Sequence, residues 1–265
     1  TTITAQIVAF KLTDYALWFV LAGFLISFIG SSRKKKLAGQ AVIGFGLLFF
    51  GMKIMGDVTK PLRTYQPFID LLLSLENPVI GVIAGAVFTT LIQSSSAATG
   101  VYIALSFQGL MPLKAAIPLI FGANIGTCTT ALLASIGASR EAKRAALAHI
   151  IFNGLKVCVF LPFIGPYRDL IFKISPHPAG ATELSSMADI VRFAPRMIAN
   201  AHTLSKVIAV AVALPFTRQL GRLCELILPR TPEEAAVRPK YLNKSLLKYP
   251  EMALTVTKKE VLRMG

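Results

Sequence analysis

Long apolar segments separated by short polar ones dominate the chain. A spanning helix needs about 20 mostly apolar residues, because the hydrocarbon core of a bilayer is about 30 Å thick. Within residues 77–138, Lys114 is the only Asp, Glu, Lys or Arg. The pattern therefore predicts an all-α integral membrane protein. Spanning segments are predicted at 15–30, 37–55, 113–137, 145–163 and 198–216.

One apolar segment, residues 78–110, is interrupted by the polar sequence QSSS at 93–96. Each arm has about 14 residues and would reach only about two-thirds of the way across the hydrocarbon core. A single broken helix and a re-entrant hairpin both fit this length. If Met55 lies outside and the basic loop at 140–144 lies inside, the span at 113–137 supplies the odd crossing between them. Residues 78–110 must then enter and leave on one side, which favours a re-entrant hairpin with its tip at 93–96.

A second polar interruption, GANIGT at 122–127, lies inside the predicted span at 113–137 and predicts a broken helix. In lipid, unwound backbone is tolerated only where protein buries it or where it lines a cavity. Two interruptions this close together therefore indicate a site. The alternative is that the Ser and Thr hydroxyls only hydrogen-bond neighbouring helices. Residues 56–76 predict an amphipathic segment at the outer interface, and residues 166–197 a mixed outer segment.

Composition and charge support a membrane protein. The chain has 265 residues, of which 54% are hydrophobic and 15% charged, with a formal net charge of +15. Soluble domains have about 25% charged residues. The basic residues lie between and after the apolar segments, as in cytoplasmic loops, which argues against a nucleic-acid partner. We therefore expect a multi-pass protein of the cell (inner) membrane with a cytoplasmic C-terminal tail. A target helix for calmodulin or nucleic acid is the alternative for that tail.

The C-terminal part differs in composition from the rest. Residues 228–249 are charged and punctuated by proline, which predicts a cytoplasmic linker. Pro250 and Glu251 then open a segment that ends in Lys and Arg, a distribution that suits the helix dipole. Residues 250–265 are therefore predicted to be the first helix of a soluble domain that this chain does not include.

Two internal matches indicate duplicated halves, an arrangement found in many transporters. Residues 1–5 align with 127–131, which directly follow the GANIG sequence. Residues 148–163 align with 201–216, and both copies begin with Ala-His and end with Leu-Pro-Phe. The second match fits a repeat, and it fits equally well two spans that each enter from a loop and end at a proline.

The polar residues of the two interruptions are uncharged and suit an anion bound together with sodium. A helix that resumes after a break presents free N–H groups and a positive dipole end, which favour an anion. Ser and Thr hydroxyls donate to anion oxygens. Hydroxyl, amide and backbone oxygens also coordinate a hard cation. A neutral site of this kind holds the two ions together, because each offsets the other's charge.

Candidate catalytic and metal-binding groups are few. No Asp, Glu, His or Cys adjoins residues 94–96 in sequence to activate a hydroxyl. The three cysteines show no metal-binding spacing and are expected to be free thiols. His149 and His202, each at the start of a span, are expected to be structural or interfacial. We therefore expect neither an enzyme nor a cofactor, and no metal other than transported sodium.

The sequences QSSSAATG, GANIGTCTTALLA and AHIIFN follow one another and resemble the sodium-dependent phosphate cotransporter family. The resemblance implies one of two inverted repeats, each with a QSSS hairpin and a G-x-N-I-G-T break. It implies that residues 1–12 are the remnant of the first repeat's broken helix and that 13–227 are the second repeat. The tail sequence from Tyr249 looks like the entry to the PhoU-like domain of bacterial members, which 250–265 would begin. The first repeat, missing here, would complete the site, and homo-oligomerisation stays open.

The resemblance also implies site residues. Those expected to bind phosphate and sodium are Gln93, Ser94, Ser95, Ser96, Asn124, Gly126, Thr127 and Thr129. Candidate lining residues beside them are Thr90, Thr99 and Thr130. From its position one turn after His149, Asn153 is a further candidate lining residue, and a role in helix packing is the alternative for it. Lys206 departs from the family pattern, since it stands where an H-x-x-F-N element in the later span would have its asparagine. A lysine there can extend toward the membrane interface, and its presence argues against this span as a lining of the site.

Together these features predict sodium-coupled transport of inorganic phosphate across the cell membrane by alternating access. Two alternatives stay open. One is a membrane sensor or anchor that reports phosphate to a cytoplasmic PhoU-like domain. The other is the same scaffold transporting another anion or exporting phosphate.

Overall fold

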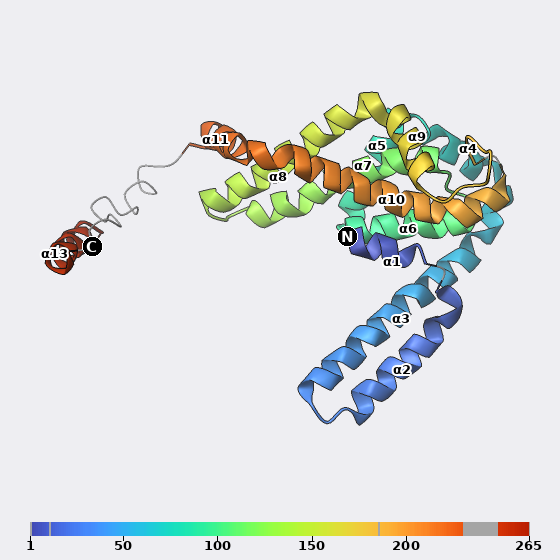
Figure 1. Ribbon diagram of the computed structural model, residues 1–265, viewed down its shortest axis with the longest axis horizontal. Helices are drawn as coiled ribbons and strands as arrows, with labels where there is room; N and C mark the ends of the chain where they lie inside the picture. The colour runs from blue at the N-terminus through green and yellow to red at the C-terminus, as the bar shows by residue number, and fades with distance from the viewer. Residues whose placement is uncertain (1, 11, 185, 230–248, 265) are drawn as a thin grey trace.

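The structure is a computed structural model that describes residues 2–10, 12–184, 186–229 and 249–264. All regular elements in these ranges are helices, which confirms the predicted all-α fold (Figure 1). The α-helices are α1 (Thr2–Val8), α2 (Ala16–Ile29), α3 (Arg33–Thr59), α4 (Gln66–Ser74), α5 (Pro78–Ile92), α6 (Ser95–Phe107), α7 (Leu113–Ser135), α8 (Arg140–Phe160), α9 (Ile164–Ile174), α10 (Met187–Ala213), α11 (Thr217–Ile227) and α13 (Pro250–Met264). Short 3-10 turns lie at Thr13–Tyr15, Lys60–Thr64, Leu161–Phe163 and Leu214–Phe216.

The long helices are apolar enough to cross a membrane, so the chain is a membrane protein. The candidate spans are Arg33–Thr64, Leu113–Ser135, Arg140–Ile174 and Met187–Ile227. The predicted span at 15–30 is shorter than expected. Its helix, α2, has 14 residues because a 3-10 turn precedes it and Gly30 leaves the helix in an extended conformation. At about 21 Å, α2 alone does not reach across a hydrocarbon core of about 30 Å.

Helices α2 and α3 form a hairpin that extends away from the other helices (Figure 1). They approach closely at two glycines, Gly23 and Gly39. A Cβ atom added to Gly39 would lie only 2.6 Å from the carbonyl oxygen of Gly23, so a larger residue would not fit there. Ser32 caps the start of α3, since its Oγ accepts a hydrogen bond from the backbone N–H of Lys35 (3.3 Å). Small residues on both helices therefore set the close packing of this hairpin.

The segments between the predicted spans contain helices, and their position outside the membrane stays a prediction. Residues 56–76 contain the end of α3, a 3-10 turn and the short helix α4, which is bent by 107° from α5. Residues 166–197 contain most of α9 and the start of α10, where the backbone N–H of Asp189 donates to Ser186 Oγ (3.1 Å). The predicted linker at 228–249 lies almost entirely outside the described residues, and α13 begins at Pro250, as predicted.

Residues 78–107 form a helical hairpin, as predicted, with α5 and α6 as its arms. The arms contain 15 and 13 residues and meet at Gln93 and Ser94. Phe88 and Tyr102 are 14 positions apart, yet their ring centroids lie 5.9 Å from each other. A continuous helix would separate these two residues by about 21 Å. The chain therefore reverses direction at the polar tip. Its re-entry into a bilayer stays a prediction.

Helix α7 is continuous from Leu113 to Ser135, so the predicted break at 122–127 is wrong. The physical reason is that glycine serves helix packing here and not unwinding. A Cβ atom on Gly122 would collide with the carbonyl oxygen of Val82 in α5, and one on Gly126 would lie 2.5 Å from that of Ala86. The backbone stays helical, and its two glycines let α7 lie directly against α5.

The two copies of the internal match, 148–163 and 201–216, have the same secondary structure. Each lies in a long helix, α8 or α10, and each ends in a 3-10 turn formed by Leu-Pro-Phe. Proline has no N–H donor for the helical hydrogen bond, which explains why both α-helices end there. The agreement is local, and the duplication of whole halves stays a prediction.

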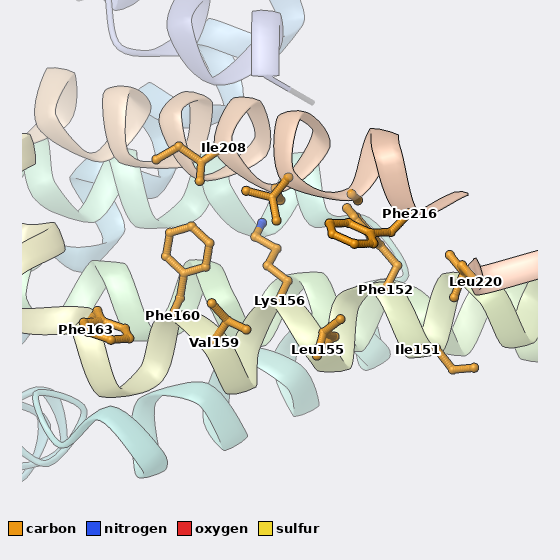
Figure 2. Close-up of a pocket in the computed structure, with 13 residues that line it drawn as sticks. Ile151, Phe152, Leu155, Lys156, Val159, Phe160, Phe163, Ile208, Phe216 and Leu220 are labelled. Atoms are coloured by element: carbon orange, nitrogen blue, oxygen red, sulfur yellow. The ribbon is translucent and has the colours of Figure 1, made fainter. Parts of the chain in front are cut away.

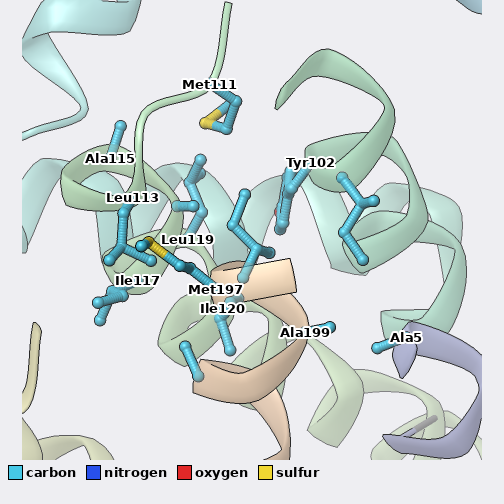
Figure 3. Close-up of a cluster of buried hydrophobic side chains, with 14 of the residues drawn as sticks. Ala5, Tyr102, Met111, Leu113, Ala115, Ile117, Leu119, Ile120, Met197 and Ala199 are labelled. Atoms are coloured by element: carbon cyan, nitrogen blue, oxygen red, sulfur yellow. The ribbon is translucent and has the colours of Figure 1, made fainter. Parts of the chain in front are cut away.

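The buried core lies where α6, α7 and α10 meet, with α1 at its edge (Figure 3). Ile103 of α6, Ile120 of α7 and Met197 of α10 are fully buried there. Ala5 places α1 against the same cluster, and Gln6 attaches α1 to α10 by donating to Asn200 Oδ1 (3.1 Å). This core fixes the hairpin arm α6 between α7 and α10.

Candidate functional site

The hairpin tip is formed by Gln93 and the helix start that follows it. Gln93 has φ of 57°, in the left-handed region, and its backbone N–H donates to the carbonyl of Thr89 (2.7 Å). Ser94 is the N-cap of α6, because its Oγ accepts from the backbone N–H of Ala97 (3.2 Å). Ser95 and Ser96 are half-buried, and their hydroxyls have no hydrogen-bond partner among the described residues.

This tip presents donors and oxygens without a formal charge. The first N–H groups of a helix have no partner inside the helix, and the dipole places about half a positive charge there. The Ser95 and Ser96 hydroxyls add two donors for an anion. The same hydroxyl oxygens and the exposed Gln93 amide oxygen are ligands for a hard cation. The geometry therefore suits an anion and a cation bound side by side.

Helix α7 contributes one further pair of predicted residues next to the arm that leads to the tip. Thr90 Oγ1 of α5 lies 3.1 Å from Thr129 Oγ1 of α7. Gly126 of α7 faces the same part of α5. A Cβ atom added to Gly126 would lie 3.0 Å from the backbone nitrogen of Thr90. Three of the predicted residues are therefore neighbours in space, one helical turn before Gln93.

The Thr90–Thr129 hydrogen bond is expected to stabilise the α5–α7 contact. In a double-mutant cycle with Thr90→Val and Thr129→Val, the coupling free energy should be about 0.5–1.5 kcal/mol, measured by reversible unfolding in detergent. Thr90→Val with Thr130→Val is the control pair, because Thr130 Oγ1 donates to the Thr127 carbonyl of its own helix (2.7 Å). Equal coupling in both pairs would refute the contact.

The other predicted residues hydrogen-bond within their own helices, and only Thr99 does so at the tip, where its Oγ1 donates to the Ser95 carbonyl (2.8 Å). Their side chains donate to a carbonyl three or four residues earlier in their own helix, at 2.7–3.1 Å. Asn124 shares a face of α7 with Cys128, whose Sγ contacts the carbonyls of Asn124 and His149 (3.6 and 3.7 Å). Asn153 of α8 lies against the same Cys128. The residues that bond within their own helix are Thr99, Asn124, Thr127, Thr130 and Asn153.

Buried basic residues on α8 and α10 were missed as candidates. Lys156 is 5% exposed and His202 is 2% exposed, and neither Lys156 Nζ nor His202 Nδ1 has a hydrogen-bond partner. Lys206 is half-buried and lies on the same face of α10 as His202, four residues later. The extension of Lys206 to the membrane interface stays a prediction. The sequence held a signal, since each lysine is the only charged residue of its predicted span.

Comparison with known proteins identifies the family. A family model described as Na+/Pi-cotransporter matches residues 1–57 and 68–164, more than half of the chain. The chain belongs to the Na+/Pi-cotransporter family. This confirms the resemblance carried by the QSSS and GANIGT sequences, and the second matched segment contains the α5–α6 hairpin and α7.

Relatives within this family cover different parts of the chain. YqeW of Bacillus subtilis, an uncharacterized protein, is 29% identical over 229 residues, which cover 86% of this chain and 69% of YqeW. YjbB of Escherichia coli, whose name provisionally assigns it to inorganic phosphate export, is 27% identical over 270 residues, covering all of this chain and 46% of YjbB. Human sodium-dependent phosphate transport protein 2B is 40% identical over 94 residues, or 33% of this chain and 14% of that protein. No solved structure matches the chain significantly.

Proposed function

We propose that this chain is the membrane part of a sodium-coupled transporter of inorganic phosphate, with the α5–α6 tip as its ion site. The tip is the observation that carries the proposal. It combines a helix start with the free hydroxyls of Ser95 and Ser96, in a chain of the Na+/Pi-cotransporter family. Phosphate transport is also what the names of YjbB and of human protein 2B describe.

The chemistry of the tip accounts for coupling. Phosphate oxygens accept hydrogen bonds from the N–H groups and hydroxyls at the start of α6. Sodium binds beside phosphate through the hydroxyl and amide oxygens, and each ion reduces the electrostatic cost of holding the other. Neither ion then binds well alone, which is the thermodynamic requirement for cotransport. A fixed guanidinium would grip phosphate bidentately and slow its release.

A second tip would complete the site. Gln93 is exposed and Ser94 to Ser96 are half-buried, so this chain covers a bound ion from one side. We assign residues 1–12 to the end of an inverted first repeat, whose own QSSS tip would face this one. Helix α13 fits the start of a cytoplasmic PhoU-like domain.

Transport by the full-length protein in vesicles tests the proposed function. With an imposed sodium gradient, radiolabelled phosphate should accumulate. Replacing sodium by potassium should lower the initial rate, because it weakens phosphate binding about 5- to 150-fold, the usual range of coupling between two binding sites. Arsenate, a tetrahedral oxyanion of similar charge, should compete better than sulfate. Equal rates in sodium and in potassium would refute sodium coupling.

Two other functions make different predictions in the same vesicles. YjbB matches the whole chain and is named for export, which favours an outward direction as the second candidate. Export predicts that phosphate leaves vesicles in which the protein's cytoplasmic side faces inward. A sensor predicts saturable phosphate binding without accumulation in either orientation.

A further inference from the structure

A second polar region lies inside the helices, away from the α5–α7 contact. We call Lys156 of α8 with His202 and Lys206 of α10 the basic cluster. His202 and Lys206 are four residues apart on one face of α10, and Lys156 extends from α8 toward α10 at the cavity that Ile208 and Ala209 line (Figure 2). Lys156 Nζ has a cation–π contact with the ring of Phe121 at 5.8 Å, and it has no hydrogen-bond partner. Among the described residues, Lys206 makes neither a hydrogen bond nor an ion pair.

The basic cluster has no acidic partner on the helices that form it. The only acidic residues of α8 and α10 are Glu141 and Asp189, which lie in the first turns of these helices. Helix α7, which packs against both, contains none. A buried ammonium group without a counter-ion is costly, and buried charges in membrane proteins are normally paired and functional. Within the described residues of α7, α8 and α10, the cluster has no acidic counter-ion, and an anion bound from outside these helices would balance its charge.

An apolar cavity adjoins the basic cluster. The cavity has a volume of about 280 Å³ and lies between α8 and α10, and Lys156 is the only charged residue among the described residues that line it. Figure 2 shows the Lys156 side chain extending from α8 toward α10, with Phe160 on one side and Phe216 on the other. Apolar walls strengthen the attraction between the ammonium group and an anion, because they lower the local dielectric constant.

The hairpin tip lies near the same part of α10. A Cβ atom on Gly109 would contact the side chains of Met187 and Val191, which places the end of the hairpin beside the start of α10. Helices α6 and α10 pack together and run in opposite directions (Figure 1). Ser95 lies at the other end of α6 from Gly109. Because the two helices are antiparallel, Ser95 is expected to lie beside a later part of α10, in the region of His202 and Lys206.

We propose that the basic cluster is a second anion site, which binds a phosphate-type oxyanion beside the hairpin tip. Lys156 and Lys206 supply positive charge and three donors each, and His202 supplies one N–H in either neutral tautomer. The oxyanion has two sources. It is inorganic phosphate passing to or from the tip, in which case the site rests on the proposed function. Otherwise it is the phosphate group of an anionic lipid whose acyl chain occupies the apolar cavity.

Phosphate and lipid binding to the full-length protein test the basic cluster. In delipidated detergent, inorganic phosphate should raise the thermal denaturation midpoint. In nanodiscs, phosphatidylglycerol should raise it relative to phosphatidylcholine if lipid is the source. Whichever of the two probes stabilises the wild type, Lys156→Met and Lys206→Met should each weaken its binding affinity at least about tenfold, as expected for a lost hydrogen bond to a charged group. Lys156→Arg should retain most of the effect.

Lys53→Met is the matched control, because Lys53 lies in a spanning helix and is exposed. It should bind both probes like the wild type. If Lys156→Met and Lys206→Met also respond to both probes like the wild type, the second site is refuted. A lysine variant that no longer responds to the probe supports the site, provided that the variant folds. Higher stability of that variant than of the wild type in the absence of anions shows that it folds.

The outcomes also separate this site from the proposed function. Sodium-dependent uptake together with unchanged phosphate and lipid binding in both lysine variants refutes the second site alone. Absence of uptake by the wild type, together with lipid stabilisation that depends on Lys156, refutes the proposed function and leaves the second site in place with lipid as its ligand.

Discussion

Replacing Ser95 with alanine is expected to reduce sodium-dependent phosphate uptake by the full-length protein about 10- to 100-fold, because a hydrogen bond to a charged group contributes about 1.5–3 kcal/mol. The Ser95 hydroxyl is half-buried at the first position of α6 and has no protein partner in the described structure. Its removal should therefore cost little stability while it weakens phosphate binding. Initial rates of radiolabelled phosphate uptake, normalised to the protein inserted in the membrane, measure this effect.

Ser106→Ala is the matched control for Ser95→Ala. Ser106 lies at the other end of the same helix, is fully buried, and donates to the carbonyl of Ile103 within α6 (2.7 Å). Its variant should transport at nearly the wild-type rate. If Ser95→Ala transports as well as Ser106→Ala, the tip is not the phosphate site.

Gln93 allows the backbone and the side chain of the tip to be tested separately. Its φ of 57° suits glycine, and asparagine tolerates it better than most residues. Gln93→Gly should preserve the turn and lose uptake, because the amide is gone. Gln93→Asn should preserve the turn and keep a shorter amide. Wild-type uptake by Gln93→Gly would show that only the turn matters.

The hairpin could be predicted from the sequence because its signals are local. A short apolar arm, four polar residues and a second short arm do not fit one spanning helix, and loop parity then selects the hairpin. The start of α13 is similar, since proline and an early glutamate favour a helix N-terminus wherever the helix packs. Each of these features depends on residues within a few turns of one another.

The continuous helix α7 and the basic cluster could not be predicted in the same way. Glycine, asparagine and threonine at 122–127 fit an unwound segment and a close-packed helix equally well in sequence. The choice depends on α5, whose carbonyls lie against Gly122 and Gly126. Similarly, Lys156 and Lys206 lie 50 positions apart, and only the packing of α8 and α10 against α7 brings these two helices to opposite sides of one cavity. Tertiary contacts decide both features.

Gly122→Ala is expected to destabilise the protein by about 1–3 kcal/mol, as overpacking of a tight contact does. The added Cβ would collide with the carbonyl oxygen of Val82 and lie 2.8 Å from the backbone nitrogen of Ala86. Neither atom belongs to a flexible side chain, so α5 itself must move. Alanine favours a helix over glycine by about 1 kcal/mol, and that gain is too small to offset the collision. Unfolding in detergent without sodium or phosphate measures the change.

Gly154→Ala is the matched control for Gly122→Ala, because the same substitution is made where there is room for the added Cβ. Gly154 lies in α8, and no atom lies within 4 Å of its added Cβ. It should therefore be neutral or stabilising by up to about 1 kcal/mol. The pair distinguishes packing from ion binding at 122–127. A packing role lowers the stability of Gly122→Ala without ligands and leaves the phosphate affinity of the folded fraction nearly unchanged. A large loss of affinity at wild-type stability would instead make this part of α7 an ion site and would contradict its role as the surface that holds α5.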